Sequence, residues 1–136
     1  MSGALTGEQF GFKKGDVIQE FGYDEDVDFE LRDAVMDTIG EDLEDEDFRG
    51  VADGILAWWR SDDGDVDDLA DFLVDCARSL EDGAGVIWCL VPSTHSQYHV
   101  STADVTEAAK VAGQSVTTTV RVGDDWTAMR ITSRGR

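Results

Sequence analysis

The hydrophobic residues of this chain fall into short continuous runs, separated by segments in which they recur at helical spacing. Three runs have the length of a buried strand: Asp16–Phe21, Gly54–Trp59 and Gly85–Val91. Continuous apolar runs that alternate with helices are typical of parallel strands covered by helices. The pattern therefore predicts a parallel α/β core.

Three segments combine helical spacing with start and stop residues. Each begins after a capping residue and is followed by a glycine: Phe29–Ile39 after Asp28, residues 66–82 after Asp65, and residues 102–112 after Ser101. A further short helix is expected around residues 48–52, where Phe48, Val51 and Ala52 are apolar.

The C-terminal part is rich in β-forming residues. The runs "SVTTTVRV" and "TAMRITS", joined by residues 123–126, predict an antiparallel hairpin. The complete order predicts an α/β fold with a Rossmann-like, mostly parallel sheet of about five strands, in the order 1-2-3-5-4 with the last strand antiparallel. We assign residues 1–12 to a flexible N-terminal segment and residues 13–136 to a single α/β domain.

The predicted strand order has a consequence for how the sheet is covered. The first three strands advance in one direction, so right-handed crossovers place all the connecting helices on the same face. Trp58 and Trp59 are adjacent in a strand and point to opposite faces, so one of them would lie on the uncovered face. An apolar face of this size needs cover, which predicts self-association, such as a homodimer, or a partner protein.

Several stretches resemble an actinobacterial family of unknown function, the one numbered 3052. They are "GDVIQEFGYDEDVD", "LAWWRSDDGD", "GVIWCLVP" and the final Gly-Asp-Asp-Trp, and the resemblance runs from about Lys13 to Thr132. It implies a cytoplasmic protein with a degenerate methyltransferase-type sheet. It implies no activity and no catalytic residue.

The segment after the first strand starts like a loop that binds S-adenosylmethionine, with Glu20 and Gly22. It continues with Tyr23 and then with Asp24, Glu25 and Asp26. These side chains are bulky where small residues would let the protein backbone approach the ligand, and their charge repels a carboxylate or a pyrophosphate. We therefore expect no cofactor, neither a methyl donor nor a dinucleotide.

The negative charge is concentrated in one part of the chain. Residues 20–82 hold 24 acidic residues and four arginines, so this block accounts for the net charge of −19. Such a surface repels nucleic acid and anionic membranes, and it attracts basic proteins.

Two cysteines in apolar settings, Cys76 and Cys89, predict buried thiols without a disulfide, as expected in the cytoplasm.

Residues with possible chemistry are few. His95 and His99 are the only histidines, and they lie with Ser93 in a polar segment that reads as a solvent-facing loop. We therefore expect no catalytic residue and no metal site. The weak candidates for binding a small molecule are Glu20, Gly22, Tyr23, Ser93, His95 and His99. The candidates for binding a partner are Trp58, Trp59, Asp24, Glu25, Asp26, Asp62, Asp63 and Asp65.

These observations favour a non-catalytic interaction or regulatory module that uses the acidic surface of residues 20–82 to bind a basic protein. One alternative is a DNA mimic, whose binding to its partner would be competed by duplex DNA. The other is a residual small-molecule enzyme at the carboxyl ends of the strands, which a thermal shift with S-adenosylmethionine would reveal.

Overall fold

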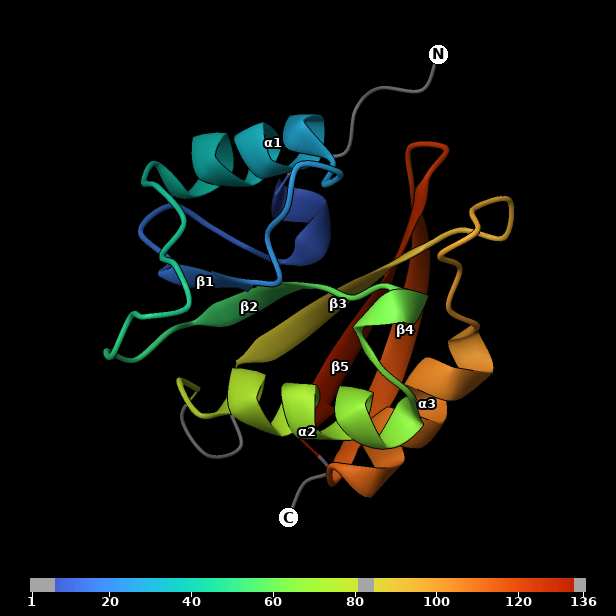
Figure 1. Ribbon diagram of the computed structural model, residues 1–136. Helices are drawn as coiled ribbons and strands as arrows, with labels where there is room; N and C mark the ends of the chain where they lie inside the picture. Colours follow the sequence, from blue (N-terminus) through green and yellow to red (C-terminus); the bar gives the residue numbers. More distant parts are fainter. Residues whose placement is uncertain (1–6, 81–84, 134–136) are drawn as a thin grey trace.

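The computed structural model describes residues 7–80 and 85–133, which form one five-stranded sheet with helices on both faces (Figure 1). The strands are β1 (Ile18–Phe21), β2 (Gly54–Trp58), β3 (Val86–Pro92), β4 (Gln114–Val122) and β5 (Trp126–Ser133). The helices are α1 (Phe29–Ile39), α2 (Val66–Ala77) and α3 (Thr102–Val111), with the short 3-10 helices η1 (Gly7–Phe10) and η2 (Ser61–Asp63).

The sheet has the predicted order, β1-β2-β3-β5-β4. β1, β2 and β3 pair in parallel, and β5 runs antiparallel to both β3 and β4. The fold class is therefore confirmed. In β4 and β5 the strands begin one residue earlier than the hydrophobic pattern indicated, at Gln114 and Trp126.

The predicted capping residues begin all three α-helices. The Asp28 carboxylate accepts from the Leu31 N–H, the Asp65 carboxylate from the Asp68 N–H, and the Ser101 hydroxyl from the Asp104 N–H. Each capped N–H is one that the helix itself leaves without an acceptor, which explains why these boundaries can be read from the sequence.

The two faces of the sheet are covered by different elements, which corrects the expectation that all helices share one face (Figure 1). α2 and α3 pack on one face, over Ile55 and Cys89. α1 and the segment around η1 pack on the other face, over Trp58 and Trp88. Trp58 and Trp59 do point to opposite faces, and both are buried. The uncovered apolar face does not exist, so self-association loses its structural argument and stays a prediction.

The opposite placement of α1 follows from where the chain goes after this helix. Glu44 forms a parallel bridge with Gln19 on the edge of β1 that faces away from β2. The Glu20 N–H donates to the Glu44 carbonyl at 2.7 Å, and the Glu44 N–H donates to the Ile18 carbonyl at 2.9 Å. The first crossover therefore runs outward, and a right-handed connection in that direction places its helix on the opposite face. Residues 45–53 then lead back to β2.

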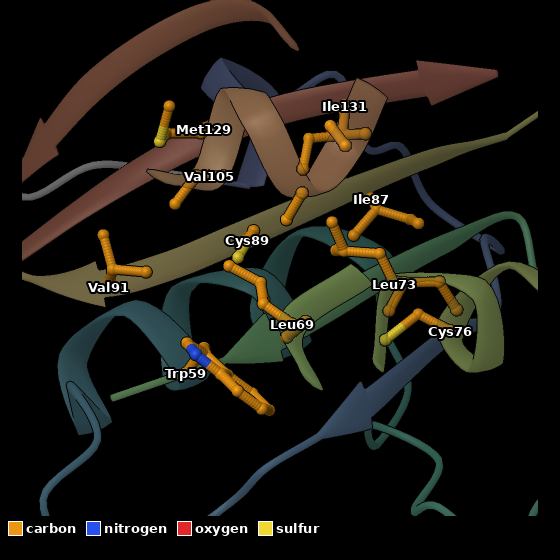
Figure 2. Packing of buried hydrophobic residues seen from close by; sticks show 14 of the residues in the cluster. Trp59, Leu69, Leu73, Cys76, Ile87, Cys89, Val91, Val105, Met129 and Ile131 are labelled. Atoms are coloured by element: carbon orange, nitrogen blue, oxygen red, sulfur yellow. The ribbon is translucent and has the colours of Figure 1, made fainter. Parts of the chain in front are cut away.

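The core under α2 and α3 is built from hydrophobic residues of these helices and of the sheet (Figure 2). Leu69, Leu73 and Cys76 of α2 face Ile87 and Cys89 of β3. Both cysteines are free and buried, as predicted. Burial raises the pKa of the Cys89 thiol to about 12 and raises that of Cys76 well above its usual value.

Three local expectations need correction. Residues 48–52 form no helix. α2 ends at Ala77, and Gly83, the expected stop, lies outside the described residues. In the expected flexible segment, residues 1–6 lie outside the described residues, but Phe10 and Phe12 are buried in the core. Phe10 stacks on Trp88 with ring centroids 4.2 Å apart, and its carbonyl accepts from the Trp88 indole N–H at 2.9 Å.

Candidate functional site

The carboxyl ends of β1, β2 and β3 lie at one edge of the sheet, where open α/β folds bind their ligands. Three segments leave the strands there: residues 22–28, 59–65 and 93–100. Most of the residues singled out in the sequence lie in these three segments, so the edge is the candidate site of this protein.

Gly22 is held tightly between the strands rather than being open to a ligand. Its φ is +77°, and a Cβ at this position would lie 2.2 Å from the Trp58 carbonyl oxygen. Its N–H donates to the Glu46 carboxylate at 2.8 Å, and its carbonyl accepts from Arg60 at 2.7 Å. Both polar groups of this glycine are therefore already used within the chain.

Glu20 is buried and serves the packing of α1 on the sheet. Its carboxylate accepts two hydrogen bonds from the Arg32 guanidinium, at 2.7 and 2.9 Å, and one from the Trp58 indole at 2.8 Å. The hydrogen bond to Glu20 raises the pKa of Arg32 above its ordinary value. A carboxylate with three donors around it has little capacity left for a ligand.

Arg60 is the residue that the sequence analysis missed, and it occupies the middle of the edge. Its guanidinium donates to the Asp26 carboxylate and the Gly22 carbonyl, and it lies 5.5 Å from the Trp126 ring centroid. Burial lowers the pKa of Arg60, but the hydrogen bond and charge of Asp26 outweigh it, so the pKa is raised. The signal was present: Arg60 directly follows the predicted strand Gly54–Trp59 and is the only basic residue between Arg49 and Arg78.

The structure gathers five of the acidic partner candidates around Arg60. The residues Asp24, Glu25, Asp26, Asp62 and Asp63 line a hollow of about 310 Å³ together with Arg60 and Tyr98. Asp65, the sixth acidic candidate, lies on the other side of η2. Trp58 and Trp59 are 0% and 8% exposed, so neither presents a large surface to a partner.

A second acidic hollow, of about 460 Å³, lies beside the first at the outer edge of β1. Its lining combines Glu20, Tyr23 and Arg32 with the segment Leu43–Asp47, which holds four carboxylates. Tyr23 is half exposed, and the Arg32 guanidinium lies 4.7 Å from its ring centroid. We call the two hollows together the acidic edge.

Ser93, His95 and His99 do not form a catalytic group. The Ser93 hydroxyl donates to the Asp124 carbonyl at 2.9 Å, and His95 is an exposed partner of Asp125 at 3.1 Å. Nδ1 of His99 lies 2.9 Å from the Pro92 carbonyl oxygen. Within residues 7–80 and 85–133, no three His, Cys, Asp or Glu side chains are arranged to hold a metal ion.

Comparison with known proteins gives a family. The model of the family described as "Protein of unknown function (DUF3052)" matches residues 7–135. The chain belongs to this family. It is 41% identical over 123 residues to "Uncharacterized protein Rv2239c" of Mycobacterium tuberculosis and to "Uncharacterized protein Mb2263c" of Mycobacterium bovis. Each match covers 90% of this chain and 75% of the relative.

Solved structures with a similar fold include several methyltransferases. Mitomycin 7-O-methyltransferase MmcR matches with a TM-score of 0.65 and 13% identity, over 88% of this chain and 50% of that chain. Magnesium protoporphyrin IX methyltransferase (ChlM) from Synechocystis, solved with bound S-adenosylmethionine, matches with a TM-score of 0.57 and 11% identity, over 93% of this chain and 74% of that chain. This member of the DUF3052 family thus has a methyltransferase-like fold, and it spans about half the length of MmcR.

No helix in the described part of the chain is long and apolar enough to cross a bilayer.

Proposed function

We propose that this protein is a non-catalytic interaction module that binds a basic segment of a partner protein at its acidic edge. One observation carries the proposal: at the edge where this fold would hold a cofactor, Gly22 and Arg60 are hydrogen-bonded within the chain, and the hollow that remains is lined mainly by carboxylates. What the edge still offers to a ligand is a rim of carboxylates.

The charge balance of the edge supports a cationic partner. The hollow around Arg60 has five carboxylates against one guanidinium, which is paired with Asp26 and lies 3.8 Å from the Asp63 carboxylate. In the second hollow, Arg32 is neutralised by Glu20, so the four carboxylates of Leu43–Asp47 have no cation of their own within this lining. Uncompensated carboxylates at a surface speed the encounter with a basic partner and select against acidic ones.

Exposed aromatic rings at the same edge support a protein partner over a simple cation. Tyr23, Phe29 and Tyr98 are 51%, 46% and 40% exposed, and the Tyr23 and Phe29 rings are in edge contact. Aromatic side chains are frequent anchors in protein interfaces, and they attract the guanidinium and ammonium groups of arginine and lysine. We place this interaction in the cytoplasm as part of the proposal, because both cysteines are free thiols.

The test is a titration of the protein with a fluorescein-labelled peptide of alternating lysine and glycine, followed by anisotropy at low and at physiological salt. The site variant replaces the exposed Glu25 and Asp62 by lysine. The control variant makes the same change of charge away from the edge, at the exposed Asp71 of α2 and Glu107 of α3.

The proposal predicts that the site variant weakens peptide binding by about tenfold more than the control variant, because charge pairs act over roughly a Debye length of 8–10 Å. Equal losses in the two variants would mean that the peptide responds to the overall charge alone. That result, or no binding by the unmodified protein, would contradict an interaction site at this edge.

A further inference from the structure

A small cavity lies on the other side of η2 from the acidic edge, between the start of α2 and the start of α3. It has a volume of about 160 Å³, and its lining includes Trp59, Ser61, Asp65, Leu69, His99 and Asp104. A dry cavity of similar size binds one benzene molecule in another protein. The space is therefore too small for a nucleotide cofactor and suits a ligand of about six non-hydrogen atoms.

Trp59 provides an unused hydrogen-bond donor at this cavity. The side chain is 92% buried and packs on Phe72 with ring centroids 4.8 Å apart. The indole N–H groups of Trp58 and Trp88 donate to Glu20 and to the Phe10 carbonyl. The indole N–H of Trp59 has no acceptor within residues 7–80 and 85–133. A ligand that supplies a hydrogen-bond acceptor in the cavity would satisfy this donor.

The cavity also presents two carboxylates, those of Asp65 and Asp104. The Asp65 carboxylate caps α2 by accepting from the Asp68 N–H at 3.0 Å. The Asp104 backbone N–H is satisfied by Ser101, and its carboxylate has no partner among the described residues. A carbonyl oxygen only accepts, so Nδ1 of His99 carries the proton that it donates to Pro92.

The charge of the cavity favours a cation although two helices start there. A bare helix N-terminus attracts anions. Here the first turn of α2 already holds Asp67 and Asp68 besides the capping Asp65, and the first turn of α3 holds Asp104. The negative charge of these carboxylates exceeds the partial positive charge of the two helix N-termini. An anionic ligand would therefore be repelled.

We infer that this cavity receives a primary ammonium group on an alkyl chain, supplied by a lysine side chain of the basic partner. The inference rests on the proposed function. A lysine side chain beyond Cα has five non-hydrogen atoms, which fit the volume. Its methylenes would pack on Trp59 and Leu69, and its ammonium group would pair with the carboxylates of Asp65 and Asp104. A peptide also brings a carbonyl oxygen for the Trp59 N–H, which a free alkylamine does not.

The cavity is close enough to the acidic edge for one segment to use both. η2 forms the wall between them: Asp62 and Asp63 line the acidic hollow, and Ser61 and the following Asp65 line the cavity. The Ser61 N–H donates to the Tyr98 carbonyl at 3.0 Å, which ties this wall to the loop before α3. A chain that crosses η2 can therefore insert one side chain into the cavity while its neighbours contact the edge.

The test follows the indole ¹⁵N–¹H resonance of Trp59, which is assigned by its loss in Trp59→Phe. The probes are Nα-acetyl-lysine N-methylamide, its norleucine counterpart without the ammonium group, and n-butylammonium chloride. We expect the lysine compound to shift this resonance with saturation, and the norleucine compound to leave it in place. Asp104→Asn should weaken the lysine response about tenfold, and Asp71→Asn on α2 should leave it unchanged.

Each contrary outcome has a distinct meaning. Equal shifts with lysine and norleucine compounds would overturn the role of the ammonium group, and a shift with n-butylammonium alone would overturn the peptide source. If the labelled peptide binds the edge but no probe shifts Trp59, this inference is wrong and the proposed function stands. If the lysine compound shifts Trp59 while the labelled peptide does not bind, the cavity is a lysine site and the proposed function is wrong.

Discussion

At the scale of single residues, Gly22 and Arg60 explain why the segment after β1 starts like a ligand loop and continues with carboxylates. Gly22 is required by the close approach of the Trp58 carbonyl, and the acidic residues that follow include the partner of Arg60. A glycine after a strand has the same appearance in a sequence whether a ligand or a neighbouring strand approaches it.

The packing of Gly22 can be measured by substitution. Gly22→Ala places a side chain at a positive φ, and its Cβ would clash with the Trp58 carbonyl oxygen. We therefore expect a loss of about 3 kcal/mol in the free energy of unfolding. Gly113→Ala is the control, because its φ is +79° but nothing lies within 4 Å of the new Cβ. It should cost about 1 kcal/mol. Equal losses in urea unfolding would show that the Trp58 contact does not constrain Gly22.

The buried thiol of Cys89 predicts a dependence of stability on pH. Its pKa is about 12 in the folded chain, and an unfolded thiol titrates near its ordinary value of 9.0. Between these values the unfolded chain loses a proton that the folded chain keeps, so stability falls as pH rises, by about 1.4 kcal/mol per pH unit.

The comparison with Cys89→Ala isolates this contribution. The variant should be less stable at neutral pH, because the core loses volume, but it should lose less stability than the unmodified protein between about pH 9 and pH 11. Parallel curves of unfolding free energy against pH would contradict the assignment to Cys89.

At the scale of elements, the sequence predicted what local chemistry specifies. The bounds of α1 and the N-caps of α2 and α3 follow from hydrophobic spacing and from side chains that accept a single N–H. The strand order followed from the alternation of elements and the terminal hairpin. The bridge at Glu44 was not predictable in this way, because a one-residue pairing has no hydrophobic pattern.

That missed bridge caused the error about the faces of the sheet, since the outward step to Glu44 determines where α1 lies. The candidate site was likewise predictable only where local sequence specifies it. The acidic segments could be named from composition, whereas the placement of Arg60 between them depends on two loops that are 34 residues apart in the sequence. The burial of Trp59 likewise depends on Phe72 of α2.

The contribution of the bridge can be tested by backbone substitution. Glu44→Pro removes the N–H that donates to Ile18, so we expect a loss of about 2 kcal/mol or more in the free energy of unfolding. Glu44→Ala keeps this N–H and should change stability by less than about 0.5 kcal/mol. If the two variants unfold at the same denaturant concentration, the bridge does not stabilise the return of the chain to β1.

At the scale of the whole molecule, the chain has a methyltransferase-like sheet whose carboxyl edge is held together by the chain's own side chains. Hydrogen bonds of Glu20, Gly22 and Arg60 connect the segments on which these residues lie. The surface around them is acidic. Fold similarity at 11–13% identity shows the architecture and carries no activity with it. The function proposed here therefore depends on whether the edge is closed to a methyl donor.

Isothermal titration of the protein with S-adenosylmethionine tests that claim most directly. Because both backbone polar groups of Gly22 are used within the chain and the remaining hollow is lined mainly by carboxylates, we predict no binding tighter than about 1 mM, which corresponds to about −4 kcal/mol. A saturable heat of binding with a Kd well below 1 mM would show that the edge still accepts the cofactor, and it would contradict the account.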